Sequence, residues 1–268
     1  MALYVSTGAR QSLLKGDSLR DMFNRGSAEL KIYSGAAPAT ADAAATGTLL
    51  VTITDTSVAT GSKQKVYFTP TVDAGAGYNT YFITINGITC SFYDSGGSTV
   101  AQVVTGLVNV LNVANGGAIT TPAGTITIPQ TSGNLTVVDS TTHVSVESTT
   151  LGESFDYSVS TTGTGSGTLT ATVNTNDRGL RFEAAADVAT GIIEKLASQT
   201  WSGVAGASGT SGYFRLSLYG DAQSLSTSAI RLQGTVNTSN ADLNMSKVNV
   251  VAGETHTIDT FQITAPAS

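Results

Sequence analysis

The sequence predicts a mainly β fold: a jelly-roll-like β-sandwich formed by the N- and C-terminal segments, with a small α+β domain inserted between them. Three observations lead to this prediction. Short runs of alternating apolar and polar residues are separated by turns rich in glycine and serine, which is typical of sandwiches and barrels. A hairpin followed by a valine-rich helix interrupts the middle of the chain. After Asn176 the character of the first segment returns.

The composition favours a protein that works by contact over one that works by chemistry. A hydrophobic fraction of 40% argues for a folded chain, whereas only 12% of the residues are charged, about half of the ~25% typical of soluble domains. The single cysteine excludes an internal disulfide framework and a cysteine-based zinc site. The net charge is −6 and there is no basic stripe, so we expect no direct nucleic-acid binding.

The N-terminal segment predicts one helix and two strands. Arg10 comes too early for the apolar core of a signal peptide, and no apolar run in the chain approaches the ~18 residues of a membrane span, so we expect no membrane association. Asp17 or Ser18 is placed to cap a short helix that Gly26 closes. Strands are expected at 30–33 and 49–54, with a loop of small residues between them.

The inserted segment begins with a strong hairpin signal at 81–93. Asn86-Gly87 is typical of a two-residue hairpin turn, which fixes the pairing of the flanking strands. This register puts six apolar side chains on one face, and Phe82, Thr84, Thr89 and Ser91 on the other. The apolar pairs are Ile85 with Ile88, Ile83 with Cys90, and Tyr81 with Phe92.

A helix is expected at 99–114, directly after the hairpin. Thr99 and Gln102 have capping-box spacing, apolar residues then recur with helical periodicity, and Gly116 follows as the stop. So many valines indicate packing against a sheet, because valine is a weak helix former. Further strands are expected at 125–128, 135–138, 143–146, 155–160 and 169–173, with a loop at 161–168.

The C-terminal segment predicts strands at 192–196, 213–219, 230–236 and 257–264. In the second of these, Phe214, Leu216 and Leu218 share one face. Tyr213, Arg215, Ser217 and Tyr219 occupy the other. We expect residues 1–61 and 178–268 to form the sandwich, and 62–177 to form the inserted domain.

Both ends of the chain resemble a family of small virion structural proteins of tailed bacteriophages. The resemblance is carried by ALYVSTGARQSLL and LKIYSGAAPATADAAATGTLL at the start, and by SGVAGASGTSGYFRLSLYGD and the residues from RLQGTVNTSN onward at the end. In the shorter relatives these halves adjoin. The interposed YFITINGITCSFYD, STVAQVVTGLVNVLN and SFDYSVST resemble a second module of phage structural proteins. The resemblance implies a virion protein in which a β-sandwich carries an α+β insertion.

Candidate catalytic and metal-binding groups are few. His143 and His256 lie outside any nucleophile motif, and Cys90 is assigned to the apolar face of the hairpin, so we expect no enzymatic activity. The aspartates are scattered, and no calcium-loop pattern or phosphate-binding loop is present, so we expect no metal or cofactor.

The remaining functional candidates lie in the C-terminal half of the chain. Trp201, Tyr213, Phe214, Tyr219 and Phe261 fit either a sandwich core with one or two exposed tyrosines, which the spacing favours, or a sugar-binding face. An interface with other subunits is expected to use arginines, which favour planar ion pairs, together with tyrosines. The interface candidates are Arg181, Arg215, Arg231, Tyr213 and Tyr219.

The favoured function is a capsid decoration protein that binds the major capsid protein, assembled in the host cytoplasm and located in the virion. A closed homo-oligomer, for example a trimer at a capsid threefold axis, fits this role. A position in the tail, neck or tail tip is the near alternative. A receptor-binding adhesin or fibre component is a second class. A polysaccharide hydrolase ranks last, because it needs a pair of carboxylates in a cleft.

Overall fold

The structure is a computed structural model that describes residues 3–264 except 74, 76, 113–117, 122–123, 128–134, 153 and 184–191. The described chain is mainly β and contains several antiparallel sheets, as the sequence predicts. It divides into two compact units, Met1–Gly61 with Asp177–Ser268 (unit 1) and Ser62–Asn176 (unit 2). These boundaries lie within one residue of the expected ones. Each unit has a hydrophobic core of its own.

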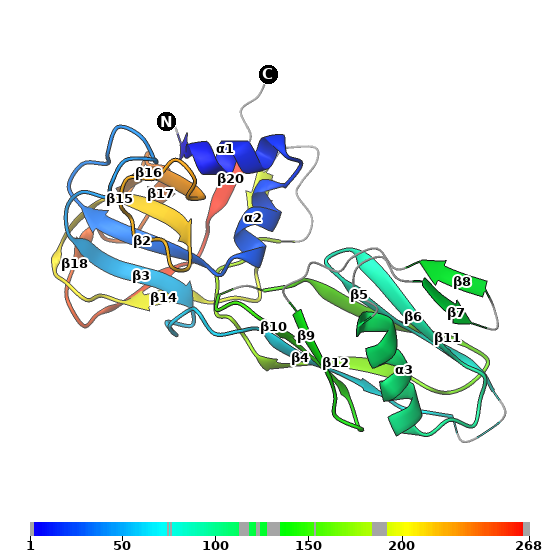
Figure 1. Ribbon diagram of the computed structural model, residues 1–268. Helices are drawn as coiled ribbons and strands as arrows, with labels where there is room; N and C mark the ends of the chain where they lie inside the picture. Colours follow the sequence, from blue (N-terminus) through cyan, green and yellow to red (C-terminus); the bar gives the residue numbers. More distant parts are fainter. Residues whose placement is uncertain are drawn as a thin grey trace. The chain divides into compact units, whose positions relative to one another are not determined.

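Unit 1 is built on one large sheet with the strand order β1-β16-β15-β2-β3-β14-β19 (Figure 1). Short strands β17 and β18 pair with β16 and β15, and β13 pairs with β20 in a separate ribbon. The helices are α1 (Thr7–Leu14) and α2 (Leu19–Arg25). The strands are β1 (Tyr4–Val5), β2 (Ala28–Ser34), β3 (Leu49–Asp55), β13 (Ile192–Glu194), β14 (Trp201–Val204), β15 (Gly209–Leu218), β16 (Arg231–Asn237), β17 (Leu243–Asn244), β18 (Asn249–Val250), β19 (Thr255–Ile258) and β20 (Gln262–Thr264).

The large sheet of unit 1 curls around its core. Phe214 of β15 and Trp201 of β14 are separated in the sheet by β2 and β3. Both nevertheless contact the ring of Phe261, at centroid distances of 5.6 and 5.5 Å. Phe182 lies against the same cluster, 5.6 Å from Trp201. Burial of these large rings supplies much of the hydrophobic stabilisation of unit 1.

The helices of unit 1 lie next to each other, and only one of them is predicted by the sequence. The α2 helix is confirmed, with the Ser18 hydroxyl accepting a hydrogen bond from the amide of Asp21. Gly26 follows it but has φ −111°, so it is not in the left-handed region expected of it. The α1 helix was not predicted, because its sequence TGARQSLL has little apolar periodicity. Its second residue is Gly8, where a Cβ would lie 2.3 Å from the carbonyl oxygen of Ser228.

The strands of unit 1 follow the predicted pattern where alternation is long. Expected strands 30–33, 49–54, 213–219 and 230–236 correspond to β2, β3, β15 and β16. The expected strand 257–264 is wrong, because it is split into β19 and β20. The β14 strand was missed, since Trp201–Val204 is too short to show an alternation.

Unit 2 contains two sheets and one helix. A sheet of order β12-β4-β10-β9 and a sheet of order β11-β5-β6 share one core, and a separate hairpin is formed by β7 and β8. The helix is α3 (Val100–Asn112). The strands are β4 (Lys65–Pro70), β5 (Asn79–Ile85), β6 (Ile88–Asp94), β7 (Ala118–Thr121), β8 (Gly124–Thr127), β9 (Leu135–Asp139), β10 (Val144–Ser148), β11 (Tyr157–Gly163) and β12 (Leu169–Thr175).

The hairpin of β5 and β6 has the predicted register. Ile85 pairs with Ile88, Ile83 with Cys90 and Tyr81 with Phe92. All of these except Ile88 belong to the core of unit 2 or pack against it. Asn86 and Gly87 have φ of 50° and 80°, as a two-residue turn with two left-handed positions requires.

The α3 helix is also confirmed. The amide of Thr99 donates to Gln102 Oε1 at 2.8 Å, and the Gln102 amide donates back to Thr99 Oγ1 at 3.3 Å. The helix contacts β4, β6, β9 and β10, so it covers the core between the two sheets. Its expected last residues and Gly116 lie outside the described part of the chain. No helix among the described residues is long and apolar enough to cross a membrane.

The sequence did not predict β4, an internal strand of unit 2. This strand lies inside the four-stranded sheet, between β12 and β10, with Val66 and Phe68 fully buried. Its sequence KVYFTP is short and ends in proline. Because proline is unusual in a central strand, this sequence does not indicate one. The expected strand 155–160 is shifted, because β11 starts at Tyr157 and continues to Gly163, into the expected loop.

Candidate functional site

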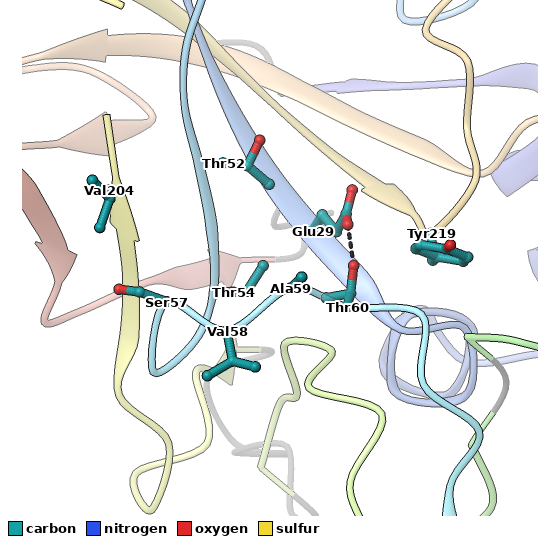
Figure 2. A pocket seen from close by; sticks show the side chains of 9 residues that line it. All are labelled: Glu29, Thr52, Thr54, Ser57, Val58, Ala59, Thr60, Val204 and Tyr219. Atoms are coloured by element: carbon teal, nitrogen blue, oxygen red, sulfur yellow. Dashed lines mark hydrogen bonds between the residues drawn. The ribbon is translucent and has the colours of Figure 1, made fainter. Parts of the chain in front are cut away.

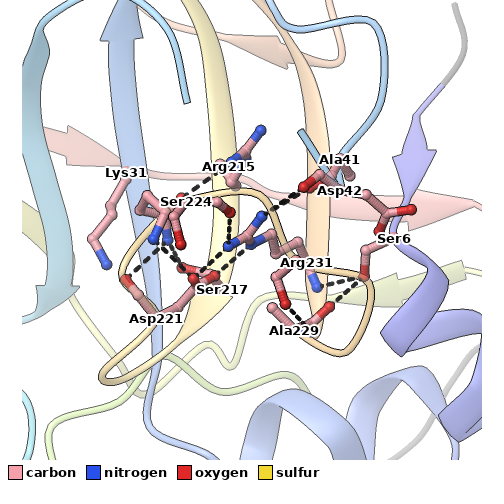
Figure 3. A network of polar contacts seen from close by, with 12 residues as sticks. Ser6, Lys31, Ala41, Asp42, Arg215, Ser217, Asp221, Ser224, Ala229 and Arg231 are labelled. Atoms are coloured by element: carbon pink, nitrogen blue, oxygen red, sulfur yellow. Dashed lines mark hydrogen bonds and ion pairs between the residues drawn. The ribbon is translucent and has the colours of Figure 1, made fainter. Parts of the chain in front are cut away.

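The most distinctive polar feature of unit 1 is the outer face of its large sheet. Strand β15 alternates as predicted, with Tyr213, Arg215 and Ser217 on the face opposite Phe214 and Leu216. Pairing with β16 and β2 then places Arg215 between Gln233 and Lys31. We call the buried groups on this face, together with the loops over them, the polar layer (Figure 3).

Arg215 is fully buried in the polar layer and bonds mainly to neutral groups. Its Nε and Nη2 donate to Gln233 Oε1 at 3.2 and 2.6 Å, and Nη1 lies 3.5 Å from Gln223 Oε1. Burial, and then the nearby charge of Arg231, lower the pKa of this guanidinium from its ordinary value. Gln233 in turn donates to the carbonyl oxygen of Pro38, which links the sheet to the loop between β2 and β3 (the loop that contains residues 35–47).

Arg231 forms the ion pair at the centre of the layer. Its Nε and Nη2 each lie 2.6 Å from a carboxylate oxygen of Asp221, and the two side chains are 1% and 8% exposed. The guanidinium also donates to the carbonyl oxygens of Ala41, Asp42 and Ser224. The Arg231 side chain therefore joins the loop between β2 and β3 to the loop that follows β15.

Tyr213 holds the other end of the same loop. Its hydroxyl donates to the carbonyl oxygen of Thr46 at 2.7 Å and accepts from the Thr46 amide at 2.9 Å. Its ring stacks on that of Tyr33 at 5.0 Å. Burial, and next the interaction with Tyr213, raise the pKa of Tyr33 to about 12.

These contacts correct the expected interface. Tyr213, Arg215 and Arg231 are 0–1% exposed, because the loops cover the half of the sheet face where they lie, so their side chains cannot meet another subunit. Arg181 is partly buried and pairs with Asp177 at 3.1 Å. Tyr219 alone among the five candidates has a largely exposed side chain, at 40%.

The uncovered half of the same sheet face forms a pocket (Figure 2). Its volume is about 490 Å³, within the usual range for small-molecule sites. Glu29 lies in it, bonded to the Thr60 hydroxyl and paired with Lys31 at 2.5 Å. The lining residues come from β2, β3, the segment after β3, β14 and the residue that follows β15: Glu29, Thr52, Thr54, Ser57, Val58, Ala59, Thr60, Val204 and Tyr219.

Glu29 and Tyr219 are the titratable residues of the pocket lining. Glu29 is the one carboxylate in the lining, whereas glycoside hydrolysis uses a pair of carboxylates. The Tyr219 ring packs directly against Gly61, since a Cβ there would lie 2.3 Å from the ring. In the part of the chain that the structure describes, no group of three or more His, Cys, Asp or Glu side chains could hold a metal ion.

The two histidines lie in different units. His143 of unit 2 contacts the Tyr67 ring at 4.2 Å and shares a hydrogen bond with the Thr142 hydroxyl. His256 of unit 1 is 5% exposed and lies 3.9 Å from Glu254. Burial and the charge of Lys247 lower the pKa of His256, against the opposing effect of Glu254. None of these contacts is with a serine hydroxyl that an imidazole could activate.

Cys90 is 1% exposed on the core face of β6, and burial raises the pKa of its thiol. We expect the native chain to react with a thiol reagent at least about tenfold more slowly than a Ser95→Cys variant, whose added thiol lies at an exposed loop position. The Ser95→Cys variant should react quickly with one equivalent of the reagent, and with a second equivalent at Cys90 only after denaturation. Fast labelling of the unmodified native chain would contradict the burial of Cys90.

The aromatic set of the C-terminal half is mostly core. Trp201, Tyr213, Phe214 and Phe261 are at most 4% exposed, and only Tyr219 reaches the surface. A sugar-binding face made of these five rings is therefore wrong, and Trp201, Phe214 and Phe261 belong to the hydrophobic core of unit 1.

The sequence missed the partners that complete the polar layer. Glu29 and Lys31 alternate on β2, and Arg231 and Gln233 alternate on β16. This repeated polar spacing on neighbouring strands was the available signal. Asp221 and Gln223 carried no such signal, because they lie in a loop.

Comparison with known proteins found no matching family model, no matching curated protein and no matching solved structure.

Proposed function

We propose that the chain is a non-enzymatic structural protein of a tailed-phage virion, a capsid decoration protein that binds the major capsid lattice. One observation supports the proposal most directly. The two segments that resemble small virion proteins form one compact unit, and the interposed segment forms another. This is the division that the resemblance implies. Unit 1 would be the anchor on the particle and unit 2 an added module.

We also propose that unit 1 is a β-sandwich of the jelly-roll type. The curled sheet supports this, because Phe214 and Trp201, from strands far apart in the sheet, contact one Phe261 ring. Two sheet layers that face each other across one core are the defining feature of a sandwich.

Exposed leucines of unit 1 are candidate anchor contacts. Leu14, at the end of α1, is 89% exposed, and Leu225, in the loop after β15, is 74% exposed. Burying a leucine against a partner typically contributes about 1.5–3 kcal/mol. The matching leucine of unit 2 is Leu151, which is 56% exposed.

The proposal is tested with purified empty phage heads and the full chain. We expect saturable binding to heads, weakened at least about tenfold by Leu14→Asp with Leu225→Asp. Leu151→Asp should bind as the unmodified chain does. The copy number in particles, from quantitative mass spectrometry, should be comparable to that of the major capsid protein.

Other outcomes overturn the capsid assignment. A copy number equal to that of a tail or neck ring would move the protein to the tail, neck or tail tip. Absence from purified particles would remove the virion role altogether.

A further inference from the structure

One face of unit 2 is rich in serine and threonine. In the β11-β5-β6 sheet, the residues opposite the core form three rows across the strands. The pairing fixes their shared side, since directly opposed residues of an antiparallel sheet point the same way. We call this set the hydroxyl face: Thr80, Phe82 and Thr84 of β5, Thr89, Ser91 and Tyr93 of β6, and Ser158, Ser160 and Thr162 of β11.

The hydroxyl face is accessible to solvent. Its three positions on β11 are exposed, as are Thr89 and Tyr93 on β6, and those on the central strand β5 are half-buried. The opposite side of the same sheet faces the core, where Ile83 and Cys90 pack beneath α3. The chain therefore uses one side of this sheet for folding and leaves the other available.

No position on the hydroxyl face is charged and none is aliphatic. Seven of the nine residues defined above carry an aliphatic hydroxyl group, which both donates and accepts hydrogen bonds. Thr84 and Thr89 already share one such bond across the strands at 2.8 Å. A ligand of this surface must offer matching donors and acceptors, because unmatched polar groups oppose burial.

Aromatic rings lie at one end and in the middle of the face. Tyr78 and Tyr93 are each 43% exposed, with ring centroids 5.8 Å apart and an angle of 35° between the rings. Phe82 is the central residue of the middle row, paired with Ser91 and Ser160. Aromatic side chains offer large rigid contact area at small entropic cost.

We propose that the hydroxyl face binds a neutral polysaccharide. A sugar ring has an apolar face of C–H groups, which suits Tyr78, Phe82 and Tyr93, and a rim of hydroxyls, which suits the serines and threonines. The absence of Lys and Arg from the face gives an acidic glycan no counter-charge. A protein partner fits less well, since protein interfaces have an apolar core and this face has no aliphatic side chain.

The test uses the purified full chain on an array of neutral and acidic glycans. The double variant Tyr78→Ala/Tyr93→Ala removes the exposed ring pair. Tyr4→Ala is the matched control, because Tyr4 is an exposed tyrosine of unit 1 that lies outside the pocket lining. Retention of the slow Cys90 labelling in the double variant shows that unit 2 remains folded.

We expect binding to at least one neutral glycan, lost by about tenfold or more in the double variant and kept in the control. The proposal is overturned by no binding to any neutral glycan, by preference for acidic glycans, or by binding that survives the double variant. Self-association of the chain that the double variant abolishes would instead assign the face to a second copy. The inference does not depend on the virion location, since head binding is probed through unit 1.

Discussion

Arg231→Met is expected to lower the free energy of unfolding of unit 1 by about 3–5 kcal/mol, the range found when one partner of a buried ion pair is removed. The variant leaves the Asp221 carboxylate, which is 8% exposed, without its two bonds from Arg231. It also leaves the carbonyl oxygens of Ala41, Asp42 and Ser224 without their donor. Urea unfolding followed by fluorescence measures the loss, because Trp201 is the single tryptophan and lies in unit 1.

Arg20→Met is the matched control. Arg20 pairs with Asp21 at 3.0 Å, but both side chains are 26% exposed, and such pairs contribute about 0–1 kcal/mol. Equal unfolding midpoints for the two variants would show that the polar layer does not depend on the buried pair.

Arg231→Met should also change how the stability of unit 1 depends on pH. Burial alone would raise the pKa of Asp221, but hydrogen bonds from Arg231 and Gln223 and the charges of Arg231 and Lys31 outweigh it and hold that pKa below the ordinary value. A lowered carboxyl pKa stabilises the fold above about pH 4 and ceases to do so as pH falls through the folded-state pKa. The deficit of Arg231→Met relative to the unmodified chain should therefore be largest near neutral pH and shrink in acid.

Phe182→Ala should also destabilise unit 1, by about 3–5 kcal/mol. Phe182 is 1% exposed, and its ring lies 6.2 Å from Phe23, 5.6 Å from Trp201 and 6.1 Å from Phe261. Its removal leaves a cavity among aromatic rings that have little freedom to collapse into it. Urea unfolding monitored by Trp201 fluorescence gives the change directly.

Two controls separate this effect from general damage. Tyr4→Ala removes a ring that is 45% exposed and should change the free energy by no more than about 0.5 kcal/mol. Leu107→Ala falls in the core of unit 2, so the transition seen by Trp201 should be unaffected. A shift caused by Leu107→Ala would mean that the units unfold together.

The sequence predicted what depends on neighbours along the chain. The turn at Asn86-Gly87 determined the hairpin register, and the capping box with its valines determined α3, because the contacts that form these elements are local. The faces of β15 were also predicted by alternation. The loops that cover its polar face were not predicted. Thr46 and Asp221 reach the sheet through these loops, whose paths depend on distant contacts. Arg215 and Arg231 were therefore expected at an interface when they are buried within unit 1.

The hydroxyl face and the pocket differ in how much of each the sequence predicts, because only the former depends partly on local contacts. The outer face of the β5-β6 hairpin followed from its register, so four of the nine residues of the hydroxyl face were predicted from the sequence. Strand β11 completes the face from a segment whose expected strand boundaries were misplaced. The pocket at Glu29 had no local signal, since its lining comes from five parts of the chain.

Because unit 2 is inserted within the sequence of unit 1, its synthesis is complete before that of unit 1. Strand β2 pairs with β15, which is made after the whole of unit 2. The β2–β3 pair of the first segment therefore lacks its partner β15 while unit 2, which is continuous in sequence, folds as it leaves the ribosome. Once folded, unit 2 replaces a long flexible loop by a compact tether, which lowers the entropy cost of closing the chain around it. Unit 2 thus acts as an assembly aid for unit 1, whose sheet is completed after it.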